Sequence, residues 1–115
     1  MKRLIKSFVY AFRGLTKTWR EEQNLQVQSL AAVLVLALGL YLNITLSEWM
    51  LLIFVIGLVL LAELVNSAVE RITDVLKPRI NGYVREIKDI MAGAVMLTSV
   101  LAVIVGAMIF LPYIF

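Results

Sequence analysis

Three long stretches of the chain are almost free of charged side chains, and they constrain the fold more than any other feature. They cover residues 25–44, 49–65 and 90–113, and the second continues as a polar helix to residue 76. Each is long enough to cross a hydrocarbon core of about 30 Å as an α-helix. The 115 residues suffice for one domain, and 62% of them are hydrophobic, more than a soluble fold of this size can bury.

The basic residues indicate how these helices are oriented. All 11 Lys and Arg residues lie either before the first stretch or between the second and the third, and Glu48 is the one carboxylate on the opposite side. The positive-inside rule predicts that the N-terminus and a loop over residues 71–89 are cytoplasmic and that the C-terminus is outside. Basic residues in these places favour an anionic lipid surface as partner and not nucleic acid.

Residues 1–20 have the pattern of an amphipathic helix that lies in the membrane surface. Large apolar residues fall in one helical sector, and Lys and Arg fill the opposite side. The apolar sector contains Leu4, Phe8, Phe12, Leu15 and Trp19. The segment serves either as a simple anchor or also as a wall of a nucleotide site, because Arg3 and Tyr10 lie on its polar face.

A stripe of polar residues begins inside the second membrane helix. Glu63 follows fourteen uncharged residues, and Asn66, Glu70 and Asp74 follow it at positions +3, +7 and +11. This spacing places all four on one face of a helix. An ionisable group within a membrane span is costly and by default marks a functional site. A stripe that runs from hydrocarbon to water suits a reaction between an apolar and a water-soluble reactant.

Each of these polar residues has a structural and a functional interpretation. Glu63 is either a protonated acid bonded to a neighbouring helix or a general base. Glu70 and Glu22, which lie on different helices at a similar expected depth, are either solvated or salt-bridged helix ends or ligands of a hydrated Mg²⁺. Asn66 either links two helices or belongs to the site. Lys88 and its neighbour form either a charged helix start or a phosphate contact.

Local signals predict where the helices end and where they pack. Lys77-Pro78 is expected to end the second membrane helix, and Asn81-Gly82 is expected to form a turn. Gly93, between two alanines, is expected to allow close helix packing.

Several chemistries are excluded by the residues that the chain lacks. The sequence contains no Cys and no His, which removes disulfides, thiol catalysis, histidine bases and nearly all zinc chemistry. A P-loop motif is also absent. The residues by themselves leave three interpretations open. These are a membrane lipid kinase, a proton-coupled transporter that uses Glu63, and a membrane scaffold. The water-side series of acids counts against a carrier, which does not need it. The residues alone indicate a membrane protein with a carboxylate-rich interfacial site and do not identify a reaction.

The pattern Glu63-x-x-Asn66-Ser67-Ala68-x-Glu70-x-x-x-Asp74, followed by Lys88-Asp89, resembles the signature of the prokaryotic diacylglycerol kinase family. The resemblance extends over essentially the whole chain. It implies an all-α integral membrane fold, with an N-terminal amphipathic interfacial helix and three transmembrane helices in a homotrimeric bundle. It also implies an enzyme of the bacterial inner membrane that uses ATP and Mg²⁺ to phosphorylate a lipid hydroxyl at the cytoplasmic surface.

The resemblance further implies roles for individual residues. Glu63 would be the general base, with Asn66 beside it in the catalytic pocket. Glu22 and Glu70 would carry the metal ions. The expected nucleotide contacts are Arg3, Tyr10, Asp74, Lys88 and Asp89.

Two lipid substrates occur among proteins of this kind, undecaprenol and diacylglycerol. The segment Lys88-Asp-x-x-Ala-Gly-Ala-Val95 and the pair Glu48-Trp49 are more similar to the undecaprenol group. The resemblance therefore mildly favours undecaprenol, with diacylglycerol as the alternative.

Overall fold

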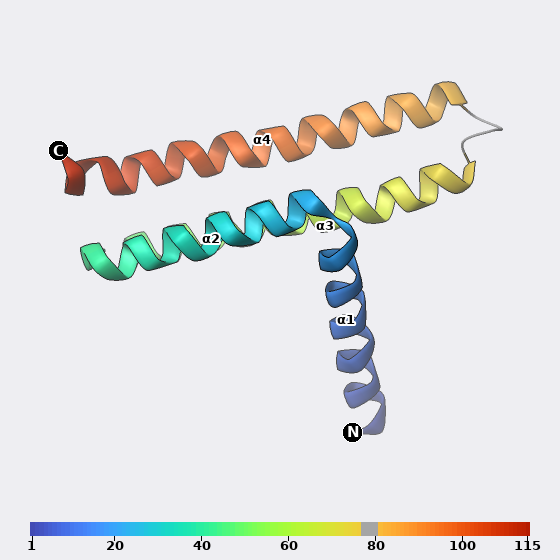
Figure 1. Ribbon diagram of the computed structural model, residues 1–115, viewed down its shortest axis with the longest axis horizontal. Coiled ribbons are helices and arrows are strands. Elements are labelled where there is room, and N and C mark those ends of the chain that lie inside the picture. Colours follow the sequence, from blue (N-terminus) through green and yellow to red (C-terminus); the bar gives the residue numbers. More distant parts are fainter. Residues whose placement is uncertain (77–80) are drawn as a thin grey trace.

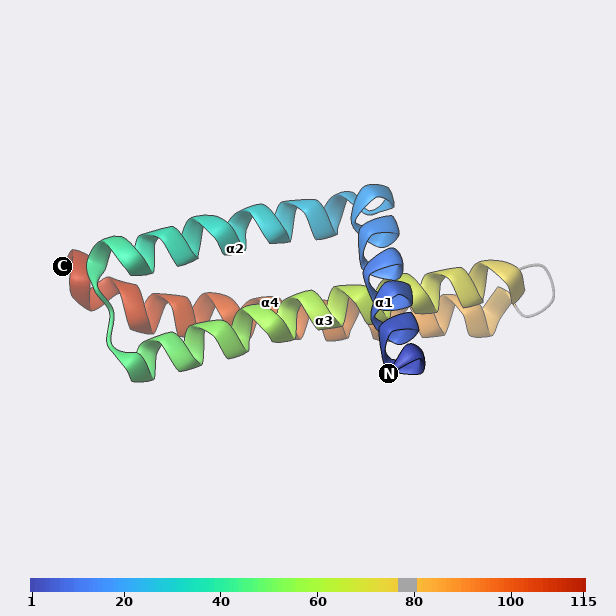
Figure 2. The same cartoon turned by 90° about the horizontal axis from the view of Figure 1, so that it is seen from below.

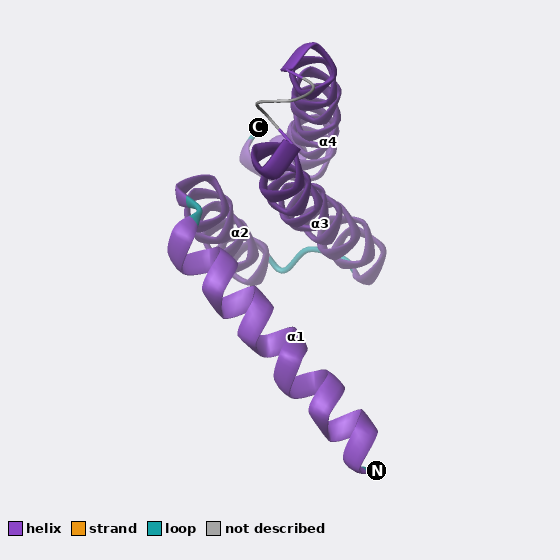
Figure 3. Ribbon diagram, turned by 90° about the vertical axis from the view of Figure 1, so that its right-hand side faces the viewer, coloured by secondary structure: helices purple, strands orange, loops and turns teal. Residues whose placement is uncertain are grey.

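The computed structural model describes residues 1–76 and 81–115, and these form four helices in the order α1 (Lys2–Glu21), α2 (Gln23–Leu42), α3 (Leu46–Leu76) and α4 (Asn81–Ile114). No strand occurs in the described part of the chain. Helices α2, α3 and α4 lie side by side, whereas α1 leaves them at a steep angle and ends with the N-terminus away from the bundle (Figures 1 and 3). The all-helical fold class predicted from the sequence is confirmed.

Three of the helices are long and apolar enough to cross a membrane, namely α2, α3 and the part of α4 from Gly82 onward. The prediction of three spans preceded by a separate N-terminal helix is therefore confirmed. The homotrimer stays a prediction, because the structure contains one chain.

The sequence-based boundaries between α3 and α4 were partly wrong. Helix α4 begins at Asn81, so Asn81-Gly82 forms its first turn and not a loop turn. Helix α3 extends to Leu76, where the end of the polar helix was also predicted from the sequence, whereas residues 81–89, predicted as part of a loop, are helical. The prediction for Lys77-Pro78 lies outside the described residues. The turn propensity of Asn and Gly is a weak local preference, which a long helix with an extended packing surface overrides.

The packing of α3 against α4 is the most extensive contact in the molecule, and α2 lies against α3 (Figure 2). A buried apolar cluster of Ile44, Leu52, Ile109 and Phe110 closes the end of the bundle at the α2–α3 turn. At the same end, Thr45 and Glu48 exchange hydrogen bonds of 2.9 and 3.2 Å as an N-terminal capping box of α3. The Tyr113 hydroxyl also donates to Glu48, which ties the end of α4 to this turn.

A single extended residue, Glu22 (φ −109°, ψ 108°), separates α1 from α2. The side chain of Gln26 reaches back and donates to the carbonyl oxygens of Trp19 (2.9 Å) and Arg20 (3.4 Å). These bonds satisfy carbonyl groups that the last turn of α1 would otherwise leave without a partner. These bonds stabilise the turn between α1 and α2, in which Glu22 lies.

Candidate active site

The polar stripe predicted on the second membrane helix lies on α3, and its burial changes steadily along the helix. Glu63 is only 1% exposed, Asn66 and Glu70 are half-buried, and Asp74 is exposed. The amide of Asn66 donates to a Glu70 carboxylate oxygen at 3.3 Å. Asn66 therefore makes a hydrogen bond within its own helix, to one of the acids of the stripe.

Helix α2 brings further polar groups to the same place. Glu63 interacts electrostatically with both Glu22 and Glu70, and the side chains of Asn66 and Gln28 lie against its carboxyl group. Two further carboxylates, Glu22 at the α1–α2 corner and Glu70 on α3, thus lie near the buried Glu63. This arrangement requires compensation by a proton, a cation or hydrogen-bond donors.

Helix α4 contributes a positively charged side chain at the exposed end of the polar stripe. The Lys88 ammonium group donates to the Asp74 carboxylate at 3.1 Å. Lys88 is half-buried and Asp89 is exposed. The structure therefore brings Lys88 to the water end of the stripe, and its role as a phosphate contact stays a prediction.

The two residues predicted on α1 are not joined to this cluster. Arg3 and Tyr10 are exposed, and the ring of Tyr10 lies 5.5 Å from the Arg13 guanidinium carbon. Because α1 points away from the bundle (Figure 3), a nucleotide contact from this helix requires either a long ligand or another chain. The role of Arg3 and Tyr10 in nucleotide binding therefore stays a prediction.

Two buried polar side chains at the site were missed by the sequence reasoning. Among the described residues, the Ser67 hydroxyl and the Gln28 amide oxygen are buried without a hydrogen-bond partner. A signal existed for each, since Ser67 lies one helical turn from Glu63 and Gln28 is a polar residue in an apolar span. Groups of this kind are rare and call for a ligand, a water molecule or a role in function.

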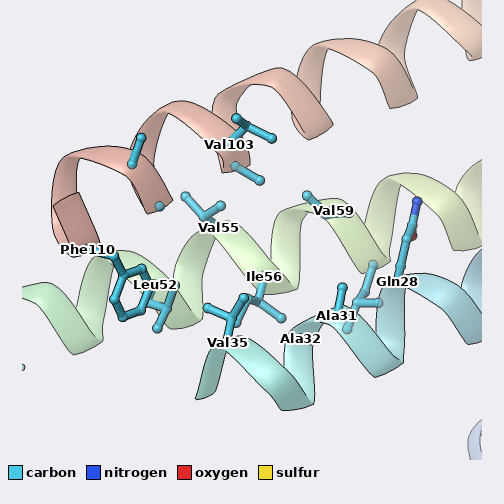
Figure 4. A pocket seen from close by; sticks show the side chains of 14 residues that line it. Gln28, Ala31, Ala32, Val35, Leu52, Val55, Ile56, Val59, Val103 and Phe110 are labelled. Atoms are coloured by element: carbon cyan, nitrogen blue, oxygen red, sulfur yellow. The ribbon is translucent and has the colours of Figure 1, made fainter. Parts of the chain in front are cut away.

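An apolar groove of about 370 Å³ lies between α2, α3 and α4, with Gln28 at one end (Figure 4). Gln28 is the one polar side chain among its lining residues, and Val59 and Leu60 lie just before the buried acid on α3. Phe110 and Leu52 line the opposite end of the groove (Figure 4). The groove therefore offers a hydrocarbon-like environment that reaches Gln28, whose side chain is a neighbour of the Glu63 carboxyl group.

The donor set fits a hydrated Mg²⁺ better than an ion held by protein alone. In the described residues, no group of three or more acidic side chains forms a metal cage. Mg²⁺ bound to nucleotide phosphates needs only one or two carboxylates and keeps several waters. Glu22 and Glu70, both half-buried, meet that requirement.

Fold and site together define a helical multi-pass membrane protein with a cluster of polar side chains on α3 and an apolar groove beside it. The chain matches the family described as prokaryotic diacylglycerol kinase over residues 9–110. It belongs to this family, and it is a membrane lipid kinase that transfers a phosphoryl group from ATP.

Curated relatives agree with this assignment. An undecaprenol kinase of Bacillus subtilis (strain 168) is 38% identical over 112 residues, which cover 97% of this chain and 91% of the relative. A diacylglycerol kinase of Escherichia coli (strain K12) is 28% identical over 102 residues, which cover 89% of this chain and 84% of the relative.

Proposed function

We propose that this enzyme phosphorylates the hydroxyl group of undecaprenol with ATP and Mg²⁺. The observation that carries the proposal is that Glu63 is buried beside Gln28, the polar residue that lines the apolar groove. A lipid alcohol in the groove brings its hydroxyl group to Glu63, while Asp74 and Lys88 lie on the water side, where a nucleotide can reach them. Undecaprenol is favoured over diacylglycerol because the relative with 38% identity is named for it.

In the proposed reaction, Glu63 takes the proton from the lipid hydroxyl group. The lipid oxygen forms a bond to the γ-phosphorus of ATP, the bond from that phosphorus to the β–γ bridging oxygen breaks, and ADP leaves. Asn66 holds the Glu70 carboxylate in place, and Lys88 neutralises phosphate charge. Asp89, Arg3 and Tyr10 are assigned to nucleotide binding with Asp74.

Glu22 and Glu70 would hold Mg²⁺ at this site. The ion supplies charge neutralisation on the phosphates when it is bound. The protein itself needs to supply positioning and a base, which accounts for a kinase site without a glycine-rich loop.

The assembly we propose is a homotrimer in the bacterial inner membrane, with the acid end of the bundle in the cytoplasm. An isolated chain leaves much apolar surface on α2 to α4 exposed, and a Cβ added at Gly93 of α4 would meet nothing within 4 Å. Small residues on an open helix face permit close approach of another helix. Light scattering of the detergent-solubilised protein, corrected for detergent, tests the trimer, and a monomeric mass would contradict it.

The substrate assignment is tested with purified protein in mixed micelles containing labelled ATP, Mg²⁺ and either undecaprenol or diacylglycerol. We expect transfer to both lipids, with a higher kcat/KM for undecaprenol. A higher value for diacylglycerol would reverse the substrate assignment. Transfer to neither lipid, by protein that circular dichroism shows to be helical, would contradict the kinase function itself.

A further inference from the structure

One ion pair joins the α1–α2 corner to α3. The Arg71 guanidinium group donates to the Glu21 carboxylate at 2.5 Å, across 50 positions of sequence. Each partner is the direct neighbour of a proposed metal ligand, since Glu21 precedes Glu22 and Arg71 follows Glu70. The pair therefore lies beside the two carboxylates that have to share one cation.

Glu22 lies at the corner between two helices, and this pair is a direct side-chain link from that corner to α3. Glu22 is the extended residue between α1 and α2, and the bonds from Gln26 hold the corner together without reaching α3. Among side-chain hydrogen bonds and ion pairs of the described residues, that of Arg71 with Glu21 alone connects α1 to α3. Helix α1 buries no residue of its own, and the nearest buried residue at the corner is Leu25 of α2.

We propose that Glu21 and Arg71 are positioning residues that hold Glu22 opposite Glu70, so that both carboxylates bind the same nucleotide-bound divalent cation. The inference rests on the proposed function and adds two residues to it. Neither is a ligand. Glu21 neutralises the charge of Arg71. Without Glu21, the positive charge of Arg71 beside the site would oppose metal binding.

The size of the effect is bounded by the exposure of the pair. The side chains of Arg71 and Glu21 are 44% and 48% exposed, and exposed ion pairs contribute modestly. Loss of the pair is therefore expected to weaken cation binding by about two- to fivefold.

The direction in which each substitution changes the cation affinity distinguishes a positioning role from a purely electrostatic one. If the two charges acted only through their field, Glu21→Gln would weaken cation binding and Arg71→Gln would strengthen it. Positioning predicts that both substitutions weaken binding. It also predicts that the exchanged pair, Glu21→Arg with Arg71→Glu, restores most of the loss.

The experiment measures Mn²⁺ binding to the full-length protein in detergent, with a non-hydrolysable ATP analogue present, from the free Mn²⁺ signal in electron paramagnetic resonance. Matched controls are Glu86→Gln and Arg85→Gln, which remove the same charges from exposed positions on α4. We expect weaker binding in both single variants of the pair, recovery in the exchanged variant, and shifts below twofold in the controls.

Opposite shifts in the two single variants, or no recovery in the exchanged one, would overturn the proposal. Wild-type affinity in all three would overturn it as well. A failure of the proposed metal site is distinguishable from these results. In that case the wild-type protein would bind no Mn²⁺, or Glu70→Ala would bind it as the wild type does.

Discussion

Replacing Glu63 by Gln tests the chemistry at the centre of the site. Glutamine has nearly the same size, so the substitution leaves the packing around this 1% exposed side chain largely intact and removes the proton acceptor. A general base contributes about 10²- to 10⁴-fold to a rate, which corresponds to about 2.7–5.4 kcal/mol of activation free energy. We expect kcat to decrease by about 10²- to 10⁴-fold, while the affinity for nucleotide changes by less than about threefold.

The assay is the initial rate of labelled phosphate transfer to undecaprenol, with nucleotide affinity measured by calorimetry on the same preparations. Glu86→Gln, the same substitution at an exposed position of α4, is the matched control and should retain the wild-type rate. A Gln at position 63 can still donate and accept hydrogen bonds. Turnover within about threefold of wild type would therefore identify Glu63 as an interhelical hydrogen-bonding group and refute its role as the base.

Three further substitutions test separate parts of the site and the fold. Lys88→Met should raise the KM for ATP about tenfold by removing a charge-assisted contact, and a rise in the lipid KM alone would contradict this role. Asn66→Leu should raise the Mg²⁺ concentration needed for half-maximal rate, because a metal-site carboxylate loses its donor; an unchanged requirement would count against it. Gly39→Ala should destabilise the protein by about 1–3 kcal/mol in thermal unfolding, since its Cβ would lie 2.9 Å from the Trp49 ring. Gly57→Ala, which meets nothing within 4 Å, is the control, and equal melting temperatures for the two would contradict the packing argument.

The helices and the polar stripe were predictable because each depends on local periodicity. An uncharged run of membrane length specifies a span whatever surrounds it, and the spacing from Glu63 to Asp74 specifies one helix face. The start of α4 at Asn81 was missed, because a turn signal of two residues says nothing about the packing surface that extends the helix.

The contacts between helices could not be predicted in the same way. Hydropathy gives the depth of a residue in the membrane but not which neighbour its side chain faces. The approach of Gln28 to Glu63 and the ion pair of Arg71 with Glu21 both depend on how α2 is rotated against α3. The path of α1, which carries Arg3 and Tyr10 away from the bundle, likewise depends on the single extended residue Glu22.

Metal rescue at position 70 tests the central claim most directly, namely that acids of the stripe hold the cation that serves phosphoryl transfer. The chain contains no Cys, so Glu70→Cys introduces a single thiol, which as thiolate favours a soft metal over Mg²⁺. We predict that Glu70→Cys loses phosphoryl transfer to undecaprenol with Mg²⁺ and regains it with Cd²⁺, while Glu86→Cys behaves as wild type with both ions. Full activity of Glu70→Cys with Mg²⁺, or an equal response of all three proteins to Cd²⁺, would contradict the account.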